Sequence, residues 1–174
     1  MLNFKQDYIA TPTGQMLIIT DENDALRCLE WTDLTDRMER LFSRQYKGQK
    51  ISLSTGKAPT HIRDALQAYF DGSLHALDHL TTKAGGTDFQ RRVWTALRSI
   101  PVGQTRSYLD IAIAIGQPKA VRAIGLANGA NPIGIVVPCH RVIGANGNLT
   151  GYGGGLDRKL WLLRHEKALS AELI

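Results

Sequence analysis

A cysteine, a histidine and an arginine occupy consecutive positions, Cys139-His140-Arg141, directly after Pro138. A neighbouring base or cation lowers the pKa of a thiol and supplies the thiolate, which is the reactive nucleophile. Adjacent side chains of a regular strand point to opposite faces. Cys139 and His140 would therefore cooperate only if Pro138 bends the chain or if a water relays the proton. The simpler alternative is a buried cysteine beside a satisfied histidine.

A helix pair precedes this motif. Residues 107–128 have the dimensions of a helix-turn-helix, with Gly116-Gln117-Pro118 at the turn. In the second helix Val121 and Ile124 are predicted to face the core, and Arg122 is the one long side chain. Three alanines are predicted to share another face: Ala120, Ala123 and Ala127. That face could approach a nucleic-acid groove closely, or it could be the packing face of an ordinary helical hairpin.

The 174 residues carry a net charge of +5 that is unevenly distributed. Residues 1–84 hold 10 Lys+Arg and 11 Asp+Glu, whereas residues 85–174 hold 11 Lys+Arg and five Asp+Glu, a net charge of +6. A basic half indicates an acidic partner, with nucleic acid the commonest, or else only a solvated surface. A hydrophobic content of 43% excludes a disordered tail. No apolar run approaches the roughly 18 residues of a membrane span.

The helices and strands that must position these residues can be predicted from the spacing of apolar residues and turn residues along the chain. Short apolar runs separated by turn residues predict an antiparallel meander over residues 1–31, followed by a helix over 33–46 and a loop over 47–58. Ile62, Leu66, Tyr69 and Phe70 mark a second amphipathic helix, with Gly72 placed to end it. After the Gly/Thr-rich stretch 81–87, Thr87 can cap a helix, the helix pair follows, and residues 132–143 are predicted to be extended. A glycine-rich loop over 144–155 leads to a last helix from Leu156. We expect two domains, a support domain at 1–80 and a functional domain at 81–174.

The sequence Pro138-Cys139-His140-Arg141-Val142 resembles the active-site motif of the O6-alkylguanine-DNA alkyltransferases, the methylated-DNA–protein-cysteine methyltransferases. The flanks keep that family's order: Asn131-Pro132, Gly151-Tyr152-Gly153-Gly154-Gly155, and Lys159 to Glu166. The resemblance is strong over 85–168, and across 1–80 it rests on architecture and on Thr11-Pro12-Thr13-Gly14. It implies an α+β fold, with an N-terminal ribonuclease-H-like antiparallel sheet with helices and a C-terminal, winged-helix-like helix-turn-helix domain.

The resemblance implies a repair reaction that each molecule performs once. Cys139 would take an alkyl group from O6 of guanine, or from O4 of thymine, in double-stranded DNA and keep it as a thioether. His140 would deprotonate the thiol through a water, and Glu166 would orient the imidazole. Tyr108 would displace the phosphate and donate toward guanine N3. Asn131 would be a structural hinge between the recognition helix and the active-site strand.

The implied partner is duplex DNA, bound through the minor groove without sequence preference. Arg122 matches a finger that enters the base stack and fills the gap left by the flipped base. Expected DNA contacts are Arg122, Tyr108, Lys119, Ala120, Ala123, Ala127, Gln90 and Arg141. Expected substrate-pocket residues are Tyr152, Gly153, Gly154, Val137 and Gly134. Gly153 and Gly134 replace bulkier residues of some relatives, which predicts tolerance of larger alkyl groups and of O4-alkylthymine.

No metal and no cofactor are expected. Cys28 has no second N-terminal cysteine for a structural zinc, Cys28 and Cys139 form no CxxC pair, and the five histidines show no ligand spacing. Two cysteines cannot form a disulfide framework, which favours a reducing, cytoplasmic location. The resemblance is to the stand-alone bacterial type without a sensor domain, expected to be a monomer with no obligate protein partner and no membrane contact. Two other functions stay open: a non-catalytic DNA-binding module, and a cysteine hydrolase using Cys139 and His140.

Overall fold

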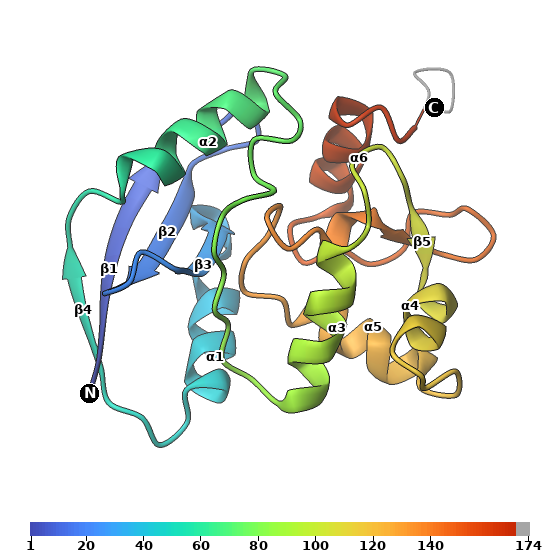
Figure 1. The fold of residues 1–174 in the computed structure, drawn as a ribbon, viewed down its shortest axis with the longest axis horizontal. Helices are drawn as coiled ribbons and strands as arrows, with labels where there is room; N and C mark the ends of the chain where they lie inside the picture. Colours follow the sequence, from blue (N-terminus) through green and yellow to red (C-terminus); the bar gives the residue numbers. More distant parts are fainter. Residues whose placement is uncertain (170–174) are drawn as a thin grey trace. The chain divides into compact units, whose positions relative to one another are not determined.

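The computed structural model describes residues 1–169, which form helices and strands in two compact units that divide between Gly86 and Thr87 (Figure 1). Residues 81–86 belong to the first unit because their backbone pairs with its sheet. Thr82 forms a bridge with Leu26, whose amide also donates to the carbonyl of Thr81 at 2.9 Å. The expected mixed α+β architecture is confirmed.

The first unit is built on a four-stranded sheet of order β3-β2-β1-β4. Its strands are β1 (Leu2–Ile9), β2 (Met16–Asp21), β3 (Leu26–Trp31) and β4 (Ile51–Thr55). The β1/β2 and β2/β3 pairs are antiparallel, which confirms the predicted meander. The loop predicted over 47–58 is wrong in part, because β4 pairs in parallel with β1. Four of its five residues are exposed, so this edge strand lacks the apolar pattern that would predict it.

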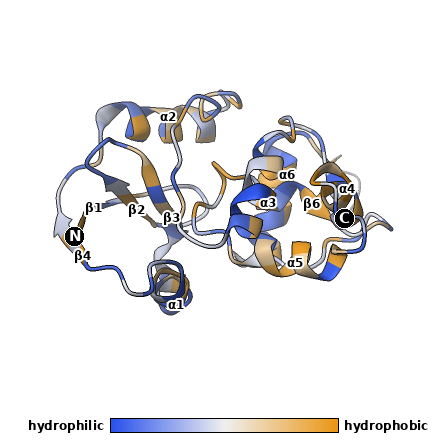
Figure 2. Ribbon diagram, turned by 60° about the horizontal axis from the view of Figure 1, so that its bottom comes forward, coloured by the Kyte–Doolittle hydropathy of each residue, from blue (hydrophilic) through white to orange (hydrophobic). Residues whose placement is uncertain are grey.

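Two helices cover opposite sides of this sheet, α1 (Thr35–Gln45) after a short 3-10 turn at Thr32–Leu34, and α2 (Thr60–Phe70) (Figure 2). Strand alternation places Leu17 and Ile19 on one face. They form a buried cluster with Phe4, Cys28 and Tyr46, against which Met38 and Phe42 of α1 pack. Cys28 is therefore a core residue, and burial raises the pKa of its thiol well above the ordinary value.

The second unit contains the predicted helix pair. Its elements are α3 (Asp88–Arg98), β5 (Arg106–Ser107), α4 (Tyr108–Ala114), α5 (Val121–Gly129), the 3-10 helix η2 (Cys139–Arg141), β6 (Val142–Ile143) and α6 (Leu156–His165). Thr87 caps α3 as predicted, and Ser107 caps α4. The indole Nε1 of Trp94 donates to the carbonyl of Ala127 at 2.9 Å, which fixes α3 against α5. Within residues 1–169, no helix has the length and apolar character needed to cross a membrane.

Candidate active site

The backbone before Cys139 is bent rather than extended, so the strand predicted over 132–143 is wrong except at β6. The amide of Cys139 donates to the carbonyl of Val137 at 2.8 Å, and Pro138 between them has φ −82° and ψ 64°. These are the angles of a three-residue inverse γ-turn. Pro138 thus bends the chain, and Cys139 starts a 3-10 helix instead of continuing a strand.

A strained residue lies just upstream. Ile135 has φ 68°, the left-handed region that a β-branched residue rarely adopts, at a cost of about 1–3 kcal/mol. The Asn131 amide holds the backbone on both sides. Its oxygen accepts from the Ile133 amide at 2.9 Å, and its nitrogen donates to the Val137 carbonyl at 2.8 Å. Asn131 is itself buried, so these bonds define the path of the chain into the thiol site.

The Cys139 thiol has an N–H donor in contact with it. Nδ2 of Asn131 lies 3.2 Å from Sγ, and Nδ2 of Asn128 lies 3.4 Å from the Cys139 carbonyl. The cysteine is 7% exposed, so little water reaches the sulfur. A donor at the sulfur stabilises negative charge there. Asn131 therefore does more than the expected hinge role, and Asn128 is a contact that the sequence did not predict.

The next residue, His140, is fully buried and is held by a carboxylate from the far end of the unit. Its Nε2 lies 2.9 Å from Oε1 of Glu166, which follows α6. A carboxylate acceptor places the proton on Nε2 and leaves Nδ1 as the basic nitrogen. Nδ1 is buried and has no hydrogen-bond partner among the described residues. The imidazole is thus oriented as a base by Glu166.

Arg141 completes this buried chain of contacts. Its Nε and one terminal nitrogen donate to the two oxygens of Glu166, both at 2.9 Å, and its other terminal nitrogen donates to the Ile100 carbonyl at 2.7 Å. The guanidinium is buried and fully engaged. Arg141 was expected to contact DNA, and in this structure its guanidinium is instead bonded to Glu166 and to the Ile100 carbonyl. Its position directly after His140 lets it orient Glu166.

These groups set one another's charge state. Burial lowers the pKa of His140 and outweighs the Glu166 charge and hydrogen bond, which raise it; the Arg141 and Lys159 charges act in the same direction as burial, so the imidazole is neutral near pH 7. Burial on its own would raise the pKa of Glu166. Its interactions with His140 and Arg141 outweigh burial and hold that pKa well below its usual range. A neutral base beside a permanent carboxylate is the arrangement that proton abstraction from a thiol requires.

Lys159, in α6, is a second feature that the sequence did not predict. Its side chain is fully buried, and Nζ donates to the carbonyls of Val142 at 2.6 Å and Thr150 at 2.9 Å. Burial lowers the pKa of Lys159 to about 8, while the nearby Cys139 charge raises it. Lys159 therefore ties the loop 144–155 to the motif strand β6 and places a cation near the sulfur. The only sequence signal for this role was a lysine within the predicted last helix, at a position that the structure shows to be buried.

The predicted substrate-pocket residues are mostly buried around the motif. Val137, Gly134 and Gly154 are buried, whereas Tyr152 and Gly153 are half-buried in the loop 144–155. That loop also meets the helix pair, because the hydroxyl of Tyr108 lies 3.4 Å from the Thr150 carbonyl. Tyr108 is the first residue of α4, so the loop, the helix pair and the thiol motif converge.

The residues expected at DNA separate into two groups. Arg122, Lys119 and Ala123 are exposed, and Ala120 is half-buried. Ala127, also expected at DNA, is only 2% exposed, and its carbonyl accepts from the Trp94 indole. Val121, predicted in the core, is exposed instead. The core side of α5 consists of Ile124, Ala127 and Asn128.

Gln90, also expected at DNA, is used at a helix start. Its side-chain oxygen accepts from the Thr87 amide at 3.0 Å, while the Thr87 hydroxyl accepts from the Gln90 amide at 3.1 Å. This reciprocal pair is a capping box, which satisfies two amides at the start of α3. The structure therefore gives the carbonyl end of Gln90 a structural role.

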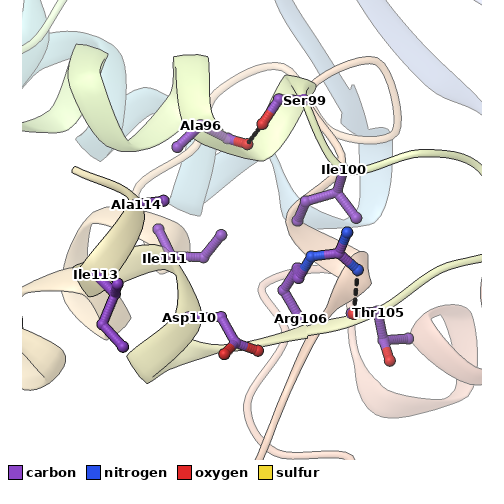
Figure 3. Close-up of a pocket in the computed structure, with 9 residues that line it drawn as sticks. All are labelled: Ala96, Ser99, Ile100, Thr105, Arg106, Asp110, Ile111, Ile113 and Ala114. Carbon is purple, nitrogen blue, oxygen red and sulfur yellow. Dashed lines mark hydrogen bonds between the residues drawn. The ribbon is translucent and has the colours of Figure 1, made fainter.

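A cavity of about 440 Å³ lies between α3 and α4 (Figure 3). Three of its polar side chains already form hydrogen bonds within the protein. Ser99 donates to the Ala96 carbonyl, Arg106 donates to the Thr105 carbonyl, and Asp110 accepts from the Ser107 amide. None of its lining residues is a cysteine, histidine or lysine. This cavity therefore offers no thiol, imidazole or amine, in contrast to the surroundings of Cys139.

The fold and the site together define a DNA-binding module that carries a buried cysteine nucleophile. A family model described as "6-O-methylguanine DNA methyltransferase, DNA binding domain" matches residues 88–168. A methylated-DNA–protein-cysteine methyltransferase of Salmonella typhimurium is 51% identical over 166 residues, covering 95% of this chain and 97% of the relative.

Solved structures agree with the sequence relatives. The crystal structure of Mycobacterium tuberculosis O6-methylguanine methyltransferase is similar with a TM-score of 0.76 at 41% identity, covering 99% of this chain and 98% of that one. A structure of Mycobacterium tuberculosis OGT in complex with DNA has a TM-score of 0.74 at 41% identity, covering 95% and 93%. The chain belongs to the methylated-DNA–protein-cysteine methyltransferase family.

Proposed function

We propose that this protein repairs DNA by moving an alkyl group from O6 of guanine, and from O4 of thymine, to Sγ of Cys139. The proposal rests on two sets of buried contacts. The Asn131 amide donates to the Cys139 sulfur, and Glu166 is hydrogen-bonded to both His140 and Arg141. Family membership supports the same reaction. Each molecule would react once, because a thioether resists hydrolysis.

The reaction balances without a cofactor. Nδ1 of His140 takes the thiol proton, directly or through a water, and Glu166 stabilises the resulting imidazolium. The S–C bond to the alkyl carbon forms while the C–O6 bond breaks. The electron pair of that bond moves to guanine, and a proton donated toward N3 by Tyr108 lets the base leave neutral. The Asn131 amide stabilises charge on the sulfur before attack.

The partner is double-stranded DNA, and the finer details of its binding form part of the proposal. Arg122 and Lys119 are exposed on the helix pair, where cations can meet phosphates or enter a groove. Arg122 would fill the gap left by the flipped base. We also propose that the protein acts as a cytoplasmic monomer without sequence preference. Binding should weaken steeply with salt, and sedimentation on DNA-free protein should give one chain.

A single-turnover experiment tests the function. The protein is mixed with a molar excess of duplex carrying one O6-methylguanine, and both repaired DNA and intact protein mass are followed. The proposal requires repair to stop at one lesion per protein, with one added methyl group. Binding without any mass change would favour a non-catalytic module. Repeated turnover on an ester or amide, with no retained adduct, would favour a cysteine hydrolase.

A further inference from the structure

The exposed face of α5 is apolar as well as cationic. Arg122 and Leu126 are four residues apart, so they lie on the same face of the helix. Leu126 is 72% exposed, the highest value among the large apolar side chains of the described part of the second unit. The hydropathy colouring in Figure 2 places several apolar residues along this helix.

This leucine is set beside functional groups. The Tyr108 ring lies against the same helix, because a Cβ built on Gly125 would stand 4.0 Å from two of its ring carbons. Gly125 is adjacent to Leu126 and three residues from Arg122, so all three groups border one surface. Isolated exposed leucines are ordinary on protein surfaces. One this exposed, a single helical turn from Arg122 on a helix that Tyr108 also contacts, calls for an explanation.

We propose that Leu126 is an apolar wedge that enters the minor groove beside Arg122 and stabilises the unstacked base step next to the flipped nucleotide. Apolar side chains of this size open base steps in other minor-groove proteins by replacing lost stacking with contact to sugars and base faces. Arg122 fills the gap in the stack, and Leu126 covers the neighbouring step. This inference rests on the proposed function, since it assigns Leu126 a place in that DNA complex.

DNA fits this surface better than a protein partner does. Lys119 and Arg122 supply positive charge, and the sequence Val121–Gly129 contains no acidic residue. The surface is also continuous with Tyr108, which reaches the loop over the thiol site through the Thr150 carbonyl. A narrow apolar projection flanked by cations matches the minor groove, whose walls are phosphates and sugars.

The test compares Leu126→Ala with Ile113→Ala, a control that truncates an apolar side chain 57% exposed on α4. We expect Leu126→Ala to lower the second-order rate constant on duplex O6-methylguanine about tenfold, because a few methylenes leave an apolar contact. The rate with a free O6-alkylguanine base should not change. Ile113→Ala should match wild type on both substrates, and Leu126→Met should recover most of the duplex rate.

An optical readout separates a wedge from a general loss of affinity. In a Cys139→Ser background, 2-aminopurine next to the lesion should brighten on binding, and at saturating protein Leu126→Ala should reduce that brightening. Equal duplex rates for Leu126→Ala and wild type would overturn the wedge. So would an equal loss on the free base, or unchanged brightening. If wild-type protein fails to repair the duplex at all, the proposed function fails instead, so the two failures are distinguishable.

Discussion

Replacing Glu166 with Gln is the most severe test of the role of Glu166 in orienting His140 as the base. Glu166 accepts from both His140 and Arg141, so the substitution removes the only carboxylate that either contacts in the described part of the chain. Breaking one side of a buried ion pair costs about 3–5 kcal/mol, because the remaining charge is left uncompensated. The amide can also present N–H to Nε2 of His140, which would shift the imidazole proton onto Nδ1. That tautomer lacks the base, and we expect a rate loss of about 10²–10⁴-fold.

The double variant Glu166→Gln/Arg141→Met separates these two effects. Removing the guanidinium takes away the uncompensated charge, so most of the lost unfolding free energy should return, apart from the bond to the Ile100 carbonyl. The imidazole stays misoriented, so the rate should stay low. Unfolding in urea gives the first quantity, and single-turnover kinetics on the free base give the second. Recovery of the rate together with stability would refute the role of Glu166 in orienting His140.

Four further outcomes follow from the structure. Because burial lowers the pKa of His140, the rate on free base should hold as pH falls through about 6.5 and decline only at the lower pH where the folded protein takes up that proton. The unfolding free energy should begin to fall earlier, as pH drops through about 6.5, because the unfolded chain takes up a proton that the folded chain resists. Asn131→Ala should slow thiol alkylation about tenfold or more, measured on free base, because Sγ loses its donor. Lys159→Met should cost about 1–3 kcal/mol in urea unfolding, because the Val142 and Thr150 carbonyls lose their shared donor. Gly103→Ala should destabilise by about 1 kcal/mol or more in thermal unfolding, since φ is +82° and a Cβ would meet the Glu166 carbonyl at 3.3 Å.

The reactive residues were predictable from the sequence because their chemistry is local. Cys139 and His140 are adjacent, and a thiol beside an imidazole indicates a nucleophile and a base without knowledge of the fold. Glu166 stands 26 residues away, and only the family resemblance linked it to His140. No spacing rule brings α6 against the motif.

For individual side chains, the difficulty was that burial could not be read from residue type. Arg141 suggested a DNA contact because it is a cation next to the motif, but its guanidinium is buried on Glu166. Ala127 fits a predicted alanine face at helical spacing, yet it is buried in the structure. Alanine is compatible with either side of a helix, so periodicity could not choose between core and surface. Leu126 was overlooked for the converse reason, because leucine usually indicates the core.

The central claim is that the sulfur of Cys139 becomes the alkyl acceptor, and peptide mapping tests it most directly. Wild type, Cys139→Ser and Cys28→Ser are each incubated with duplex O6-methylguanine, digested and sequenced by tandem mass spectrometry. Both cysteines are buried, so Cys28→Ser controls for loss of a buried thiol. The account predicts one methyl on the Cys139 peptide of wild type and Cys28→Ser, and none on Cys139→Ser. Methylation of the Cys139→Ser protein at any residue, with repair of the DNA, would contradict it.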